Sequence, residues 1–300
     1  MGPTVDALTI RLDGTYVDAT FGAGGHSALI LAALGAAGRL IALDADPSAG
    51  ARAIADPRFT LINANFRDLA SVLDALAIER FDGVLFDLGV SSMQFDEGER
   101  GFSFRTAAPL DMRMDPTRGE SAADLLATRD ERELADLIYE YGEEKKSRRI
   151  ARGIVAARPL DTTRQLVDVI RAAIPPPARR RGAHPARRTF QAIRMEVNRE
   201  LPNLADGLDD SVHVIGPEGR VLVLAYHSLE DRMVKEKFAE WADTGAAPAL
   251  PKLAIPEPKR NPLVRLLTRR PLRPRADEVA ANRRAESVRL RAVERLPGSA

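Results

Sequence analysis

The chain has 300 residues, of which 45% are apolar, and its mean hydropathy is −0.21. These values indicate a soluble globular protein with one large domain or, as we expect, two ordinary ones. The absence of cysteine excludes disulfides, thiolate metal ligands and a cysteine nucleophile. No apolar run approaches the roughly 18 residues that a membrane span requires, and the N-terminus does not have the order of a secretory signal. We therefore expect a cytoplasmic protein that does not enter a membrane.

The formal net charge of +1 conceals a strong asymmetry along the chain. The stretch from Lys145 to Arg199 contains 15 basic and three acidic residues, a net charge of +12, so the remainder carries −11. Such segregation indicates a module that faces a polyanion, usually a nucleic acid, joined to an acidic body. The alternative is that these arginine-rich helices are only solvated.

The first hundred residues alternate short apolar runs with helical segments. We expect a helix near residues 25–34, and strands at residues 16–20, 39–44, 59–63 and 81–87. Continuous apolar strands separated by helices predict a parallel sheet that is covered on both faces.

The pattern changes after Ser92 to a loop rich in Gly, Asp and Arg, and then to helical periodicity from about residue 121 to residue 201. Strand character returns at residues 219–226, after a turn at residues 216–219. Two further strands are expected near residues 263–267 and 288–292. The sheet is therefore interrupted by a helical segment and resumes near the end of the chain.

This order of elements predicts the α/β class, with a Rossmann-like doubly wound sheet and an inserted all-helical domain. We assign residues 1–104 and 202–300 to the sheet domain and residues 105–201 to the basic helical domain. The inserted domain contains the segment of high positive charge.

A glycine-rich turn, Gly22-Ala23-Gly24-Gly25, joins the first strand to the first helix. Glycines there let the backbone approach a ligand closely. Asp44 ends the next strand 20 residues after Gly24, where a carboxylate can bind the ribose hydroxyls of a nucleotide-like cofactor. The alternatives are a tight turn without a ligand and, for Asp44, a helix N-cap.

The details of this turn separate two possible cofactors. A dinucleotide requires the spacing G-x-G-x-x-G, from which the sequence departs, and an acid, Asp18, lies in the first strand. S-adenosylmethionine has a cationic sulfonium and amino group and no phosphate, so nearby acids suit it better. Phe66, after the third strand, is expected to pack on the adenine or, alternatively, in the core.

Seven segments of the chain carry long and distinctive motifs, at residues 18–27, 86–94, 100–104, 109–116, 141–144, 184–192 and 226–232. Taken together and in this order, they resemble the MraW family of methyltransferases. The resemblance implies a class I methyltransferase that transfers a methyl group to N4 of a cytosine in the decoding region of 16S rRNA, in the small ribosomal subunit. It also implies that the family's cofactor contacts fall on Gly24, Gly25, His26, Asp44, Phe66, Asp87 and Gln94. The family usually has a segment rich in His, Pro, Val and Leu before the first strand. The cofactor or RNA site would be incomplete if that segment is absent from this protein.

The expected reaction requires positioning of the target amine more than a strong base. The N4 lone pair of cytosine is conjugated into the ring, so the enzyme must orient the amine toward the methyl group and accept hydrogen bonds from its protons. Asp87, at the end of the fourth strand, is expected to accept from this amine or to hold the methionine end of the cofactor; a strand-end cap is the alternative. Ser92 or a backbone carbonyl is an alternative acceptor for the amine.

Tyr226 and His227 follow the fifth strand, at the same predicted sheet edge as Asp87. An aromatic ring there can stack on a flipped base, so both residues are candidates for the reaction site. For His227 a core or helix-capping role is an equal alternative. The lack of cysteine excludes the thiol adduct that pyrimidine C5 methylation ordinarily uses.

The candidate RNA contacts lie in the basic segment and are Arg179, Arg180, Arg181, Arg187, Arg188 and Arg194. The apolar spacing of Phe190, Ile193 and Val197 predicts the buried face of a helix, with Arg194 and its neighbours on a face that meets phosphate. Two other functions remain open: a nicotinamide-dependent oxidoreductase, and a non-catalytic RNA-binding or ribosome-assembly factor. The sequence leaves open whether the protein is a monomer or a homodimer.

Overall fold

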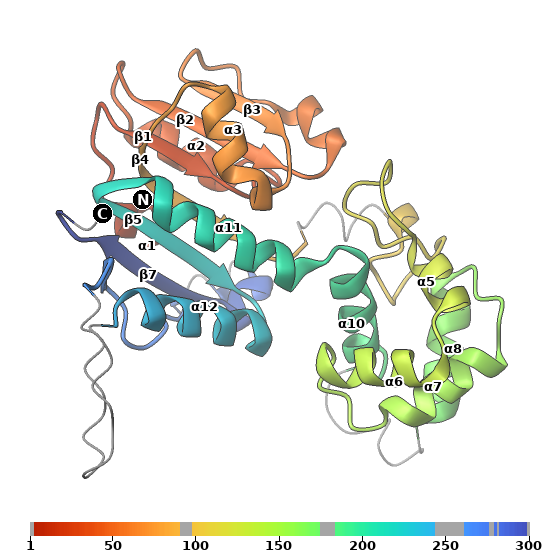
Figure 1. Ribbon diagram of the computed structural model, residues 1–300. Helices are drawn as coiled ribbons and strands as arrows, with labels where there is room; N and C mark the ends of the chain where they lie inside the picture. The colour runs from red at the N-terminus through yellow and green to blue at the C-terminus, as the bar shows by residue number, and fades with distance from the viewer. Residues whose placement is uncertain are drawn as a thin grey trace, which may run out of the picture. The chain divides into compact units, whose positions relative to one another are not determined.

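The computed structural model describes residues 3–90, 98–174, 184–243, 261–275, 279–280 and 282–298 (Figure 1). The chain divides into two compact units. The sheet unit consists of Met1–Gly89 and Asn203–Ala300, and the helical unit consists of Val90–Pro202. The first boundary differs from the one expected after residue 104, because Phe102 belongs to the core of the helical unit and Val90 and Phe104 pack against that core.

A seven-stranded sheet with the order β3-β2-β1-β4-β5-β7-β6 forms the centre of the sheet unit. Strands β1 to β5 are parallel to one another, whereas β7 pairs antiparallel with both β5 and β6. The strands are β1 (Thr15–Asp18), β2 (Arg39–Asp44), β3 (Phe59–Asn63), β4 (Phe81–Asp87), β5 (Ile215–Ala225), β6 (Val264–Leu266) and β7 (Arg289–Arg295). The predicted doubly wound α/β fold is confirmed.

Two of these strands differ in extent from the sequence-based expectation. Strand β1 ends at Asp18, two residues earlier than expected. Strand β5 begins at Ile215 and includes residues 216–219, which were expected to be a turn. Phe81 of β4 pairs with Ile215 and Gly83 pairs with Arg220, so the register shifts over these residues. The four residues from Gly216 to Gly219 are thus accommodated as an irregularity within one strand.

Alternating side chains of the strands enter two hydrophobic cores on opposite faces of the sheet. Val84 and Phe86 of β4 lie in one core, and Leu85 between them lies in the other. The first face is covered by α3 (Leu69–Ala75), α11 (Glu200–Val214) and α12 (Ser228–Trp241), and the second by α1 (Pro3–Leu8) and α2 (Gly25–Ala33). Figure 1 shows α3, α11 and α12 on the same side of the strands. Four short 3₁₀ helices are also described: η1 (Pro47–Arg52), η2 (Phe66–Asp68), η3 (Gly98–Arg100) and η4 (Arg283–Ser287).

The helical unit packs its helices around a separate apolar core. These helices are α5 (Ala122–Thr128), α6 (Glu131–Glu140), α7 (Ser147–Ala156), α8 (Thr163–Ala173) and α10 (Arg187–Val197). Capping boxes begin α5 at Ser121, α6 at Asp130 and α8 at Thr162, so the sequence marks each of these starts locally. The helix expected over Phe190, Ile193 and Val197 is α10, and Phe190 and Ile193 are buried in the core.

The loop before α5 brings two sequence segments together within the helical unit. The Arg100 guanidinium donates to the carbonyl oxygens of Arg113 and Met114, at 2.8 and 2.6 Å. Gly101 has φ +75°, and a Cβ atom built there would lie 2.4 Å from the Pro109 carbonyl oxygen. Glycine is therefore required at this position by both the backbone conformation and the close approach of the chain.

No helix among the described residues is long and apolar enough to cross a membrane.

Candidate functional site

The carboxyl ends of β1, β4 and β5 meet at one edge of the sheet unit. Here the strand order reverses, because the chain runs from β1 through β2 to β3 on one side of β1 and then crosses to β4 on the other side. Ligands of doubly wound sheets bind at such a point. Backbone hydrogen bonds to neighbouring strands continue beyond the ends of β1 and β4. Phe21 N–H donates to Leu43 O at 2.8 Å, and Leu88 N–H donates to Leu224 O at 3.0 Å.

The glycine-rich turn lies directly after β1 and leads into α2. Gly22 and Gly24 have φ values of 53° and 78°, a conformation that favours glycine. Gly24 is the N-cap of α2, and a Cβ atom on Gly25 would meet nothing within 4 Å. The turn therefore presents open backbone at a helix N-terminus, as a closely bound ligand requires.

Asp18 differs from our expectation that this acid favours a cationic ligand directly. Its side chain is completely buried and accepts hydrogen bonds from the Ser27 hydroxyl at 2.6 Å and the Thr20 N–H at 3.2 Å. Burial raises the pKa of Asp18, and the Ser27 hydrogen bond opposes this rise. Asp18 thus ties the turn to α2 and has a structural role.

Asp44 ends β2 next to the same turn, as the spacing predicts. Its carboxylate accepts from the Gly22 N–H at 2.9 Å and from the Asp46 N–H at 2.8 Å, one on each oxygen. Burial raises the pKa of Asp44, and these two backbone donors oppose the rise. Each carboxylate oxygen has a second lone pair, so the group can hold the turn and accept from a ligand at the same time.

Asp87 at the end of β4 is held by side chains from two other elements. Tyr226, after β5, donates its hydroxyl proton to Asp87 Oδ1 at 2.8 Å. His26, in the first turn of α2, places Nδ1 3.3 Å from Asp87 Oδ2. The Asp87 N–H donates to the Thr20 hydroxyl at 2.6 Å. The structure therefore brings together His26, Asp87 and Tyr226, and adds Thr20, which sequence reasoning missed.

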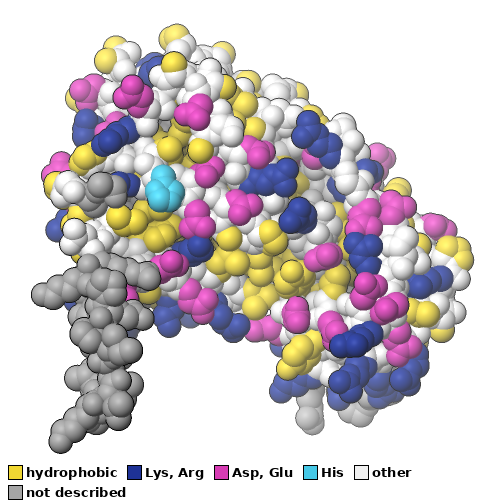
Figure 2. All heavy atoms as spheres, viewed as in Figure 1, with side chains coloured by type: hydrophobic (Ala, Val, Ile, Leu, Met, Phe, Trp, Pro, Cys, Tyr) yellow, Lys and Arg dark blue, Asp and Glu magenta, His cyan; other side chains and the backbone are white. Residues whose placement is uncertain are grey.

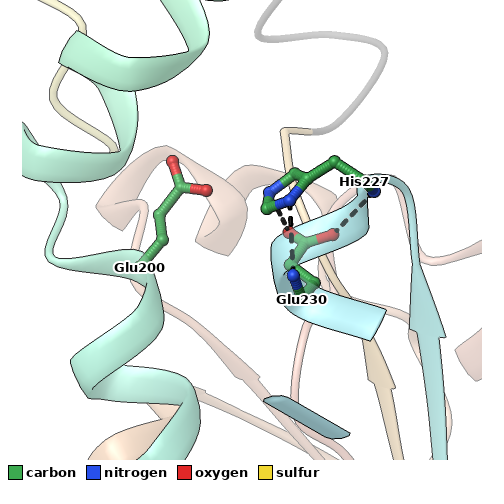
Figure 3. Close-up of side chains that lie close together, drawn as sticks. All are labelled: Glu200, His227 and Glu230. Atoms are coloured by element: carbon green, nitrogen blue, oxygen red, sulfur yellow. Dashed lines mark hydrogen bonds and ion pairs between the residues drawn. The ribbon is translucent and has the colours of Figure 1, made fainter. Parts of the chain in front are cut away.

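His227 caps a helix, the alternative that the sequence left open. Its Nδ1 accepts from the Glu230 N–H at 3.3 Å, while Glu230 Oε2 accepts from the backbone N–H groups of Tyr226 and His227. The two side chains point toward each other at the start of α12, and His227 Nε2 lies 3.0 Å from Glu230 Oε1 (Figure 3). The three-residue spacing of a capping box was the sequence signal that identifies Glu230. The capping contact explains the position of His227 Nδ1, and the expected role of His227 in the reaction stays a prediction.

Phe66 begins η2 and packs against the core of the sheet unit. Its ring meets Phe86 edge to face, with centroids 5.7 Å apart. A Cβ atom on Gly207 would lie 2.9 Å from the Phe66 carbonyl oxygen and 3.0 Å from its ring. Phe66 is nevertheless only partly buried, so the expected adenine contact stays a prediction.

The arginines expected to bind RNA fall into three groups. Arg187 and Arg188 are exposed at the start of α10, where Arg188 donates to the Glu143 carbonyl oxygen. Arg194, by contrast, has a side chain only 14% exposed and forms a bidentate ion pair with Glu200 at 2.7 and 2.9 Å. Two of the Arg194 donors are therefore used within the helical unit, and the expected contact of this side chain with phosphate stays a prediction. The candidates outside the described residues are Ser92, Gln94, Arg179, Arg180 and Arg181.

Two half-buried polar side chains, one on α10 and one at its C-cap, also bind within the helical unit. Gln191 donates to the Tyr141 carbonyl oxygen at 3.1 Å, and Asn198 donates to the Met112 carbonyl oxygen at 2.7 Å. The helix thus has a polar face that fixes neighbouring loops. Exposed basic side chains lie on α7 and just before it, and Figure 2 shows Lys and Arg side chains grouped over the part of the helical unit where α6 and α7 lie.

The sheet order, the antiparallel β7 and the glycine turn after β1 together define the class I methyltransferase fold. The chain belongs to the MraW methylase family, whose family model matches residues 1–296.

Curated relatives align over nearly their whole length. A "Ribosomal RNA small subunit methyltransferase H" from Symbiobacterium thermophilum is 51% identical, and the alignment covers 98% of this chain and 94% of the relative. Proteins of the same name from Methylibium petroleiphilum and Brevibacillus brevis are 50% and 47% identical, with 97% and 99% of this chain covered and 92% and 96% of the relatives.

Proposed function

We propose that this chain transfers a methyl group from S-adenosylmethionine to N4 of a cytosine in the decoding region of 16S rRNA. Membership of the MraW methylase family and the names of the relatives support a methyltransferase that acts on small-subunit ribosomal RNA. The observation that carries the proposal within the structure is Asp87, held at the sheet edge by Tyr226 and close to His26.

The residues around the glycine turn fit S-adenosylmethionine. The open backbone at Gly25 and the Asp44 carboxylate suit a nucleoside whose ribose hydroxyls need an acceptor. Arg52 donates to the Gly22 carbonyl oxygen, so this cation holds the turn from outside. Gly24, His26, Phe66 and Gln94 complete the proposed cofactor contacts. When bound, this cofactor supplies a methyl group on a cationic sulfonium.

Asp87 orients the target amine in this proposal. The Tyr226 hydroxyl uses one lone pair of Asp87 Oδ1, which leaves further acceptor positions on the carboxylate for an amine N–H. With one N–H held, the nitrogen lone pair points toward the methyl group, and orientation of this kind provides most of the rate gain. The amine becomes acidic as it attacks, so its proton can leave to the carboxylate or to water. Ser92 is the alternative acceptor.

Tyr226 positions Asp87 and is the candidate for contact with the base. Its hydroxyl fixes the rotamer of the Asp87 carboxylate, and its ring lies at the same sheet edge, where it can stack on a flipped cytosine. No cysteine is available to form a covalent adduct at C6 of the pyrimidine. The expected product is therefore N4-methylcytosine and not 5-methylcytosine.

The test is transfer of labelled methyl from S-adenosylmethionine to small ribosomal subunits that lack the modification, followed by mass spectrometry of the nucleosides. Asp87→Ala should lower the rate at least tenfold at saturating cofactor, because a loss that survives saturation reports on the transition state. Asp74→Ala, an exposed carboxylate on α3, is the matched control and should leave the rate unchanged. Tyr226→Phe should give an intermediate loss, since it removes one donor to Asp87 and retains the ring.

Three outcomes would contradict the proposal. If saturating cofactor restores the Asp87→Ala rate, Asp87 is only a cofactor ligand. A product of 5-methylcytosine or a 2′-O-methyl nucleoside would refute the proposed chemistry. Thermal stabilisation by NAD but not by S-adenosylmethionine would favour the oxidoreductase alternative.

A further inference from the structure

A cavity of about 230 Å³ lies within the helical unit, away from the residues assigned so far. It is lined by the segment Phe104–Ala107, by Arg164, Val167 and Arg171 of α8, and by His184. We call it the α8 cavity. The three α8 residues lie at positions i, i+3 and i+7, and therefore share one face of the helix.

Buried contacts fix the walls of the α8 cavity. The completely buried Thr163 hydroxyl donates to the Thr106 carbonyl oxygen at 2.7 Å and accepts from the Ala108 N–H at 3.0 Å, which ties the loop to the start of α8. The His184 ring stacks on the Phe104 ring, with centroids 4.5 Å apart and planes at 10°. Phe104 in turn meets the buried Phe190 edge to face. The core of the helical unit thus holds the loop backbone and the Phe104–His184 stack in place, whereas the arginine side chains that line the cavity are exposed.

The lining of the α8 cavity is cationic. Three of its residues are arginines, and no Asp or Glu is among the described residues that line it. One acid, Asp168, pairs with Arg164 at 3.2 Å on the exposed side of α8. Arg105 and Arg171 have no carboxylate partner among the ion pairs of the described residues, so a bound anion would find two uncompensated guanidinium groups.

Hydrogen-bond donors outnumber acceptors around His184. Its Nδ1 lies 3.3 Å from the Ala186 N–H donor, and its Nε2 lies 3.2 Å from Nη2 of Arg171. A neutral imidazole accepts at only one nitrogen, and a guanidinium can only donate. When Nδ1 accepts from Ala186, the Nε2 proton and the Arg171 donors are directed at the same space. An anionic oxygen in the cavity would accept from both.

The charge of the neighbouring arginines also acts on the protonation of His184. Burial lowers the pKa of His184, and the charges of Arg171 and Arg105 lower it further. An anion between these groups would offset the repulsion and favour the imidazolium form. Binding of the anion should therefore be coupled to uptake of a proton by His184.

We propose that the α8 cavity binds a backbone phosphate of the RNA substrate, held by Arg105, Arg171 and Nε2 of His184. This inference rests on the proposed function, since it takes RNA as the substrate. Phosphate contacts of this kind fix the register of a nucleic acid on a protein and do not read its sequence. The cavity would thus position the RNA on the helical unit.

The first test follows the His184 imidazole by NMR in the full-length protein, with and without inorganic phosphate and a short 16S rRNA fragment. The chain has four histidines, so loss of one signal in His184→Gln assigns the resonance. We expect the pKa of His184 to rise when either ligand is added. An unchanged pKa with the bound RNA fragment would overturn the proposal.

The second test compares the RNA affinity of Arg171→Gln with that of Arg132→Gln. Arg132 is an exposed arginine on α6 that pairs with Asp136 and does not line the cavity, which makes it a matched control. Arg171→Gln should weaken RNA binding several-fold. It should also reduce the slope of the logarithm of the binding constant against the logarithm of the salt concentration by roughly 0.7–0.9, the value for one phosphate contact. Arg132→Gln should change neither. Equal effects of the two variants would overturn the proposal.

Measuring S-adenosylmethionine binding, RNA binding and RNA methylation on the same proteins distinguishes failure of this inference from failure of the proposed function. If wild-type protein binds and methylates RNA but Arg171→Gln has the same affinity and slope, the cavity has no role and the proposed function stands. If wild-type protein binds S-adenosylmethionine but neither binds nor methylates RNA, both proposals fail. A His184 response to inorganic phosphate but not to RNA would refute the RNA assignment, since the site would then hold a free anion.

Discussion

Gly101→Ala should destabilise the helical unit by about 3 kcal/mol. A residue with a side chain at φ +75° costs roughly 1 kcal/mol relative to glycine. The added Cβ atom would lie 2.4 Å from the Pro109 carbonyl oxygen, where real Cβ atoms do not approach within 3.0 Å. The obstacle is backbone, so the loop must move, and overpacking of this kind costs about 1–3 kcal/mol more.

Gly119→Ala is the matched control for the steric part of this cost. Gly119 lies in the same unit with φ +73°, but a Cβ atom there would meet nothing within 4 Å. In this variant the free energy of unfolding of the helical unit should therefore fall by only about 1 kcal/mol, the cost of placing a side chain at a positive φ. The difference between the two variants isolates the close approach to Pro109.

The assay must report on the helical unit separately. Hydrogen exchange of peptides from α8 and α10 gives the opening free energy of that unit. Fluorescence of Trp241, the single tryptophan, reports on the sheet unit and should give the same urea midpoint in both variants. If Gly101→Ala and Gly119→Ala lower the opening free energy of the helical unit equally, the reasoning is refuted, because the close approach to Pro109 would then not contribute to the destabilisation.

Three further predictions concern the cofactor, the RNA and the buried acid. Asp44→Ala should weaken S-adenosylmethionine binding by about 1–3 kcal/mol, because the ribose hydroxyls lose a charged hydrogen-bond acceptor. Calorimetry measures this affinity, and an unchanged affinity in a folded variant would show that Asp44 does not bind the cofactor. Replacing both Arg187 and Arg188 by Gln should lower RNA affinity and leave cofactor affinity unchanged. The log–log slope of the RNA binding constant against salt concentration should fall by up to roughly 0.7–0.9 for each phosphate that is no longer bound. An unaltered slope would mean that both arginines are only solvated. Burial raises the pKa of Asp18, so its contribution to stability is greatest below the unfolded-state pKa of about 3.9 and falls as pH rises through the folded-state value. Asp18→Asn should thus gain stability relative to wild type as pH rises, and a difference in urea midpoint that stays constant with pH would contradict this.

The sequence by itself determined most of the sheet and the sheet edge at which the candidate site residues lie. Continuous apolar runs predicted β2, β3 and β4 with their observed bounds, because strands buried on both faces leave an unambiguous pattern. Parallel strands place their carboxyl ends at one edge, so Asp44, Asp87 and Tyr226 could be assigned to that edge without coordinates. Glycine spacing predicted the turn before α2, since only glycine readily adopts the φ values of Gly22 and Gly24.

Only the tertiary structure decided which polar side chains are available to a ligand. Asp18, Arg194 and His227 have the residue types of a functional site, yet each is engaged by partners that the chain brings to it through packing. Hydrogen bonds between side chains depend on distances of a few tenths of an ångström and on burial, which sequence spacing does not specify. The α8 cavity likewise depends on the stacking of Phe104 and His184, which are 80 residues apart and meet only when the helical core forms.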